Sequence, residues 1–171
     1  RFSITNPFSK EGSFTSGVDQ QEQAKPAQRL QDGYEYQKDG EYEKAIATFN
    51  DVASAKPELV DIKEAEFQLG RTYVLNKDYA NAATTLQQFY DQYPEDPRHD
   101  QVGFMLDVAY RELKQWDEAM TFLSDYAEKS PGIEPYVRYQ LAVVYRDSGN
   151  FPGAIEELGK AVTATGPRRF A

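Results

Sequence analysis

A repeat with a period of about 36 residues constrains the fold of this chain more than any other feature. Four similar segments start at Pro26, Lys63, Asp100 and Pro135, so the starts are 37, 37 and 35 residues apart. In each segment, apolar and small residues recur three and four apart, stop at a short polar turn, and then resume. This pattern predicts two amphipathic helices joined by a tight turn, repeated four times. The predicted helices lie near 26–39, 42–55, 61–76, 79–92, 98–113, 116–129, 134–148 and 151–164.

The same residue types fall at the same places in each segment. Small residues let the two helices of a pair approach closely, and a tyrosine fills the remaining gap between them. The small residues are Gly33, Gly70 and Ala142 on the first helices and Ala45, Ala82, Ala119 and Ala154 on the second helices. The tyrosines are Tyr36, Tyr73, Tyr110 and Tyr145. Pro57, Pro94 and Pro131 follow the second helices of the first three segments, where proline ends a helix.

These places resemble the signature of the tetratricopeptide repeat (TPR). The resemblance covers residues 26–167 and implies an all-α fold, a right-handed α-solenoid of four TPR helix-turn-helix units. The units lie near 26–59, 63–96, 100–133 and 135–168, in a solenoid domain that spans 26–171. Residues 1–25 precede it and are expected to form an extended N-terminal arm.

The arm shows neither a helical nor a strand period, and it is rich in Ser, Thr, Gly, Asn and Gln. Phe2, Phe8 and Phe14 are its large aromatic anchors. Two interpretations stay open: the arm packs on its own solenoid, or another subunit holds it. The chain starts at Arg1 rather than Met, so a removed leader or lipid anchor is also an open alternative.

Composition excludes several function classes. The formal charge of −9 argues against nucleic acid as a partner, because phosphates require clustered Lys and Arg. The chain has no Cys and a single His, which argues against a metal site, and no Gly-rich phosphate loop follows a predicted strand. No apolar run approaches the roughly 18–20 residues of a membrane span. We therefore expect no catalytic residue, cofactor, metal or membrane-spanning segment, and interpret His99 as a solvated or helix-capping residue.

Two departures from the repeat carry their own predictions. The third unit has Asp107 where the signature has Gly or Ala, and Arg111 four residues later is placed for a helical ion pair. The last second helix carries Ile155, Leu158 and Val162 but no capping helix follows it, although repeat arrays normally end in one. We predict that another subunit, or further chain, covers this end.

The TPR resemblance also implies a concave groove lined by particular places of the first helices. The residues predicted to bind a partner there are Tyr34, Lys38, Phe67, Arg71, Phe104, Arg111, Tyr136, Tyr139 and Arg146. Apolar sockets beside guanidinium groups suit an extended peptide with apolar anchors and a carboxylate. The alternative is that about half of these aromatic residues only pack between adjacent first helices. The Lys and Asn clamp of the chaperone-binding members is not matched.

The predicted function is that of a non-catalytic scaffold, a subunit of a larger envelope or membrane-associated hetero-complex whose partners are protein subunits or peptides. The arm, the groove and the uncapped C-terminal end are its expected docking surfaces. The alternatives are a free adaptor that recruits client peptides into its groove and, in third place, an enzyme with an undetected site. The repeats are similar to those of bacterial envelope proteins, including outer-membrane assembly lipoproteins. This likeness favours a periplasmic or other extracytoplasmic location, with the cytoplasm as the alternative.

Overall fold

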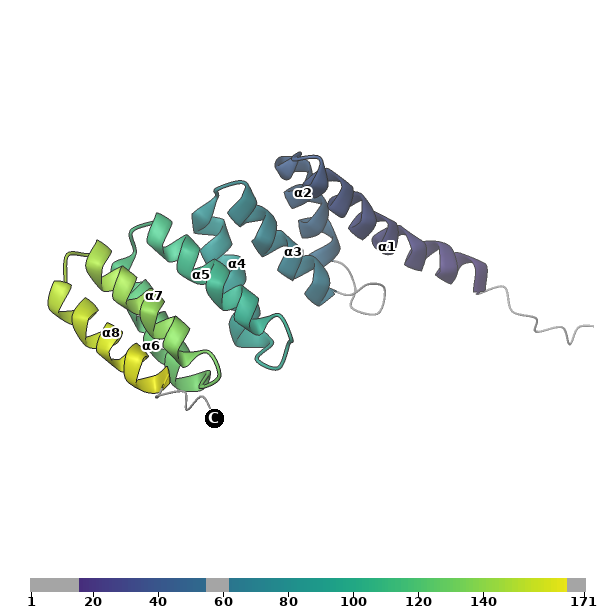
Figure 1. Cartoon of the computed structure of the whole chain (residues 1–171). Coiled ribbons are helices and arrows are strands. Elements are labelled where there is room, and N and C mark those ends of the chain that lie inside the picture. Colours follow the sequence, from purple (N-terminus) through teal and green to yellow (C-terminus); the bar gives the residue numbers. More distant parts are fainter. Residues whose placement is uncertain (1–15, 55–61, 166–171) are drawn as a thin grey trace, which may run out of the picture.

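The computed structural model describes residues 16–54 and 62–165, and these residues form eight helices and no strand. The helices are α1 (Ser16–Lys38), α2 (Tyr42–Ala53), α3 (Ile62–Leu75), α4 (Tyr79–Gln92), α5 (His99–Glu112), α6 (Trp116–Lys129), α7 (Glu134–Asp147) and α8 (Phe151–Thr165). Each helix packs on the next one along the chain, so the helix pairs stack in order from α1 to α8 (Figure 1). The predicted all-α solenoid of four helix pairs is confirmed.

The four turns inside the pairs share one conformation. The fifteenth residue of every unit has a positive φ: 78° at Gly40, 59° at Lys77, 56° at Lys114 and 86° at Gly149. In each turn the next backbone N–H donates to the carbonyl of the unit's tyrosine, at 2.8 to 2.9 Å. This bond satisfies a carbonyl at the helix end, as in a Schellman motif. The sequence repeat is therefore also a repeat of backbone geometry.

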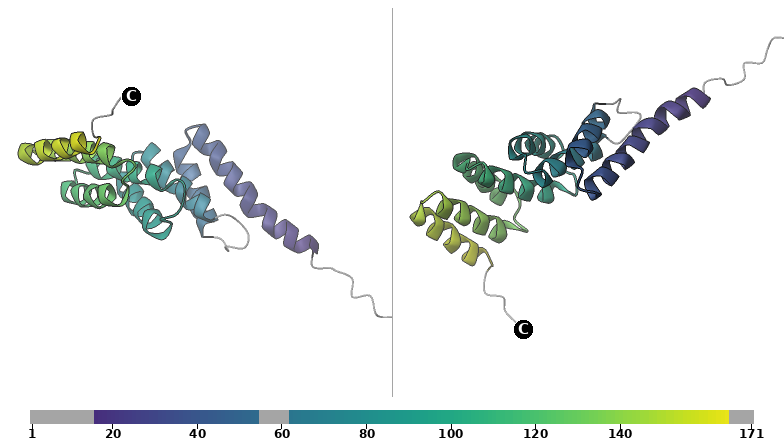
Figure 2. Two further views of the ribbon diagram at one scale, coloured as in Figure 1. Left: turned by 60° about the horizontal axis from the view of Figure 1, so that its bottom comes forward. Right: turned by 90° about the horizontal axis from the view of Figure 1, so that it is seen from above.

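The first helix differs from its prediction. It begins at Ser16 rather than Pro26, so the expectation of an extended arm is wrong for residues 16–25. The physical reason is that 18–25 contains Gln, Glu, Ala and Lys, which favour a helix, while Pro26 removes a single backbone donor. The other seven helices begin and end within two residues of their predicted bounds. The first helix extends beyond the pair that it forms with α2 (Figure 2).

Close approach between paired helices depends on glycine, as predicted. A Cβ on Gly33 would lie 2.5 Å from the Phe49 ring, and one on Gly70 would lie 2.6 Å from the Leu86 side chain. In the third unit the close approach lies one turn earlier, because a Cβ on Gly103 would lie 2.9 Å from the fully buried Tyr126 ring. The irregular third unit therefore has its own close packing.

Candidate functional site

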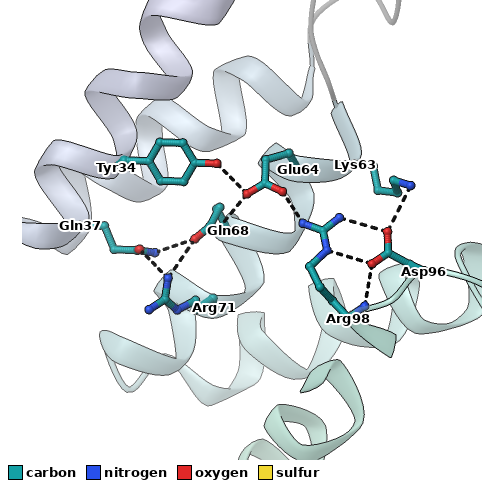
Figure 3. Close-up of polar contacts among 8 residues, drawn as sticks. All are labelled: Tyr34, Gln37, Lys63, Glu64, Gln68, Arg71, Asp96 and Arg98. Atoms are coloured by element: carbon teal, nitrogen blue, oxygen red, sulfur yellow. Dashed lines mark hydrogen bonds and ion pairs between the residues drawn. The ribbon is translucent and has the colours of Figure 1, made fainter. Parts of the chain in front are cut away.

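The first helices α1 and α3 are joined by a polar network on the predicted groove (Figure 3). The hydroxyl of Tyr34 donates to Oε1 of Glu64 at 2.6 Å. Nε2 of Gln37 donates to Oγ1 of Thr72 at 2.7 Å, and the guanidinium of Arg71 donates to Oε1 of Gln37 at 3.1 Å. The two predicted groove residues in this network, Tyr34 and Arg71, are half-buried and hold neighbouring units together.

A second cluster ties the loop before α5 to α3, and it was missed by the sequence reasoning (Figure 3). Asp96 accepts from Nε of Arg98 at 2.8 Å and pairs with Nζ of Lys63 at 3.1 Å, while Arg98 also binds Glu64. Only 2% of the Asp96 side chain is exposed, and the hydrogen bond from Arg98 holds its pKa well below the usual range. The sequence feature that could have indicated this cluster is the run Asp96-Pro97-Arg98. An Asp side chain in such a turn often accepts the backbone N–H two residues later, and Asp96 accepts that of Arg98 at 2.9 Å.

Phe67 is a correction to the predicted groove. Its side chain is only 4% exposed, and its ring lies under the Arg98 guanidinium at 4.5 Å. Burial against Phe89 and Arg98 makes it part of the core rather than a surface that a partner can contact. Phe104 is half-buried, and its ring packs edge-on against Tyr136 at 5.2 Å. The alternative of packing between adjacent first helices therefore describes Phe104, which contacts Tyr136 on α7, whereas Phe67 is buried against the second helix α4 and the loop before α5.

The predicted pair of Asp107 and Arg111 is present, with 3.6 Å between the charged atoms. Arg111 also reaches Asp147 on α7 at 3.6 Å, so it bridges two units. Burial raises the pKa of Asp107, and its Oδ1 has no hydrogen-bond partner among the described residues. The Arg111 side chain thus stabilises the contact between two units and is less accessible to a ligand.

The remaining predicted groove residues differ in exposure. Lys38 is exposed, Tyr136 is 51% exposed and the Arg146 side chain is 59% exposed, with Arg146 bound to Asp147. Tyr139 is 50% exposed, although it occupies the fifth place of its unit, where Phe67 is buried and Phe104 is half-buried. Tyr139 therefore belongs to the C-terminal end of the solenoid. The arm anchors Phe2, Phe8 and Phe14 lie outside the described residues.

Exposed large apolar side chains gather in two places. One set lies on groove-lining places of α3, α5 and α7: Leu75, Val108 and Tyr136. The other set lies on the last unit: Tyr139, Phe151, Ile155, Leu158 and Val162. A hollow of about 230 Å³ between α7 and α8 is lined by members of this second set together with Val143 and Arg146. Patches of this kind mark interaction surfaces.

The part of the chain described by the structure shows no group of three acidic or histidine side chains that could hold a metal ion. His99 stacks on the buried Tyr90 ring with 3.8 Å between ring centroids, so it has a packing role at the start of α5. None of the helices in 16–54 and 62–165 has the length and apolar character to cross a membrane.

Comparison with known proteins gives a family and a fold. A model of the family described as YfiO, outer membrane lipoprotein, matches residues 22–163. No match is found among curated protein sequences. Among solved structures, MamA AMB-1 is 23% identical with a TM-score of 0.60, over 82% of this chain and 73% of that one.

Two further solved structures have the same fold at a similar sequence identity. A chain described as "Podosopora anserina putative kinesin light chain nearly identical TPR-like repeats" is 18% identical with a TM-score of 0.67, over 85% and 77% of the two chains. MamA 41-end from Desulfovibrio magneticus RS-1 is 19% identical with a TM-score of 0.65, over 84% and 77%. At these identities the likeness shows the TPR fold alone.

Proposed function

The chain belongs to the YfiO family of outer membrane lipoproteins, and from this membership we propose that it is a non-catalytic scaffold subunit of a larger envelope assembly. The TPR fold supports protein partners, because stacked units build extended surfaces suited to binding. The proposed location is the extracytoplasmic side of the envelope. Cell fractionation with protease accessibility tests it, and recovery in the cytoplasm alone would contradict it.

One observation carries this proposal: the exposed large apolar side chains of the described residues all lie at places of the predicted groove or on the last described unit. Scattered single exposed residues need no explanation, but this concentration on two surfaces does. In the groove, Leu75, Val108 and Tyr136 come from three successive first helices. An extended segment of a partner could contact them one after another.

The charged side chains beside these apolar residues define the partner further. Lys38 and Arg146 are the exposed cations among the predicted groove residues, since Arg71 and Arg111 are held within the fold. A partner segment with apolar anchors and a carboxylate fits this surface. Exposure of Tyr136 and Arg146 also supports the second candidate function, a free adaptor that recruits client peptides.

Photo-crosslinking tests the groove. A crosslinking amino acid at position 136 is expected to capture a defined partner in the native cells, and one at the exposed position 84 on α4 serves as the control. Val108→Asp places a charge among the groove's apolar side chains and should abolish the crosslink, whereas Thr84→Asp should not. Identical products at the two positions would contradict a groove function.

The contribution of charge is tested separately. Lys38→Ala combined with Arg146→Ala should weaken binding of the captured partner if the partner's carboxylate binds in the groove, and unchanged affinity removes these two side chains from recognition. We also propose that Phe2, Phe8 and Phe14 bind another subunit. Deletion of residues 1–15, which leaves the described helices intact, should then release that subunit, and retention would contradict docking by the arm.

A further inference from the structure

The outer stripe of each second helix occupies the same four places in its unit: the seventeenth, twenty-first, twenty-fourth and twenty-eighth. In units 1 to 3 these residues are Tyr42, Ile46, Phe49 and Ala53; Tyr79, Ala83, Leu86 and Tyr90; and Trp116, Met120, Leu123 and Ala127. None of them is exposed. In the last unit the stripe is Phe151, Ile155, Leu158 and Val162, which are 62%, 72%, 42% and 72% exposed.

In each earlier case the first helix of the following unit packs on this second helix, as α3 does on α2, α5 on α4 and α7 on α6. That helix buries its third, seventh and tenth places, all at most 7% exposed: Ala65, Leu69 and Thr72 on α3; Val102, Leu106 and Ala109 on α5; and Val137, Leu141 and Val144 on α7. These side chains share one pattern, a small or β-branched residue, then leucine, then another small or β-branched residue, at spacings of four and three. The pattern lies on one helical face.

The first helix of the first unit shows which way this face points. No described unit precedes α1, and its third, seventh and tenth places carry Gln28, Asp32 and Glu35. Gln28 and Glu35 are exposed and Asp32 is half-buried. The three places therefore face the preceding unit, and they are polar where the described structure has no such unit.

We propose that α8 binds an amphipathic helix of a partner protein, laid on its stripe as α7 lies on α6. This partner helix carries Ala or Val, then Leu, then Ala, Val or Thr, at positions i, i+4 and i+7. The hollow of about 230 Å³ beside Phe151, Ile155 and Leu158 offers a socket for the leucine. The inference rests on the proposed scaffold function and specifies the partner of its C-terminal surface.

A second copy of this chain fits the stripe poorly. Its α1 presents Gln28, Asp32 and Glu35 at the three places that must become buried, and burying unpaired polar groups is unfavourable. Its α8 would set large side chains against large side chains, whereas the interface seen three times sets large against small. Both copies also carry a formal charge of −9, which disfavours their association.

A peptide copied from α7, with the sequence of residues 134–147 and a fluorescent label, provides the probe. It carries valine, leucine and valine at the three places, and the control peptide replaces them with the Gln, Asp and Glu found in α1. Fluorescence polarisation with the full-length protein from its native cells is expected to show saturable binding of the first peptide only, and an absence of binding would mean that further chain of the same protein covers the stripe. Ile155→Asp should weaken binding at least tenfold, while Thr163→Asp, a charge on the same helix outside the stripe, should change it less than twofold.

Three outcomes overturn the inference. They are equal binding of the two peptides or no binding at all, equal loss in both variants of the chain, and a dimer of the chain alone that Ile155→Asp dissolves. The proposed groove function is read separately, from crosslinking at position 136. If the crosslink at position 136 forms but the α7 peptide does not bind, only the inference about α8 is wrong. If the peptide binds but no crosslink forms, only the proposed groove function is wrong.

Discussion

Replacing Arg98 with alanine tests whether the ionic cluster between α3 and the loop before α5 holds the second and third units together. Arg98 binds Asp96 and Glu64, and its guanidinium lies 4.5 Å from the Phe67 ring centroid and 5.5 Å from that of Phe89. Its removal leaves the Asp96 carboxylate, 2% exposed, with Lys63 as its remaining ionic partner in the described structure.

The expected loss of stability follows from burial. Removing one partner of a buried ion pair typically costs about 3–5 kcal/mol, because the other charge stays buried without compensation. Lys63 remains at 3.1 Å and offsets part of this cost, whereas loss of the guanidinium from the Phe67 ring adds about 0.5–1 kcal/mol. We therefore expect Arg98→Ala to lower the free energy of unfolding by about 3–4 kcal/mol at neutral pH.

The pH dependence gives this prediction a second readout. The pKa of Asp96 is lower in the folded chain than the value of about 3.9 in an unfolded one, so its stabilisation is complete above that value. It is lost as the pH falls through the folded pKa. The difference between the wild type and Arg98→Ala should therefore shrink as the pH falls below about 4.

Urea unfolding followed by circular dichroism at pH 7 and at pH 2.5 measures both effects. The control is Arg29→Ala, because Arg29 also contacts a carboxylate, Asp51 at 2.6 Å, but both side chains are more than half exposed. Such a surface pair contributes about 0–1 kcal/mol. An Arg98→Ala variant no less stable than the control, or a difference that is the same at both pH values, would refute the reasoning.

Two further contrasts test the packing. Gly70→Ala should destabilise the chain by about 1–3 kcal/mol, because the new Cβ would lie 2.6 Å from the buried Leu86 side chain. Gly159→Ala has open space around the new Cβ and should stabilise α8 by up to about 1 kcal/mol. Thermal unfolding measures both changes. Tyr90→Phe should be neutral or stabilising, because its hydroxyl is buried and without a hydrogen-bond partner in the described part of the chain, while Tyr126→Phe should cost about 0.5–1.5 kcal/mol through loss of a 2.8 Å hydrogen bond. Burial raises the pKa of Tyr90 to about 12, above the value of about 10 in the unfolded chain. The protonated hydroxyl therefore contributes its full stability below about pH 10, and this contribution is lost as the pH rises toward about 12. Because phenylalanine cannot ionise, Tyr90→Phe should reduce alkaline unfolding in a pH titration.

Most of the fold could be predicted from the sequence because the units repeat. Four tyrosines, the polar turn that follows each of them and the small residues indicate the helix pairs, and each unit supports the prediction of the next. The start of α1 could not be predicted in this way. It lies before the repeat, and Pro26 matched a helix start there as well as it matches the interior position that it occupies.

The groove was harder to predict because a place in the repeat fixes the direction of a side chain but not what lies against it. Arg71 donates a hydrogen bond to Gln37 of the neighbouring unit, and Phe67 is covered by Arg98 from the loop before the next unit. Such contacts depend on residues outside the repeat signature. Because these residues do not recur from unit to unit, the repeat pattern of a single sequence does not predict the contacts.

The same place in successive units therefore differs in exposure along the described array. Phe67 is buried under Arg98 and Phe104 is half-buried against Tyr136. Tyr139, at the equivalent place, is half exposed beside Phe151 and Ile155. An aromatic side chain that packs against neighbouring residues in the middle of the array is thus open to a partner in the last described unit. Docking at this end can thus use the interface that joins the units, and a partner needs only the helical face that α3, α5 and α7 already present.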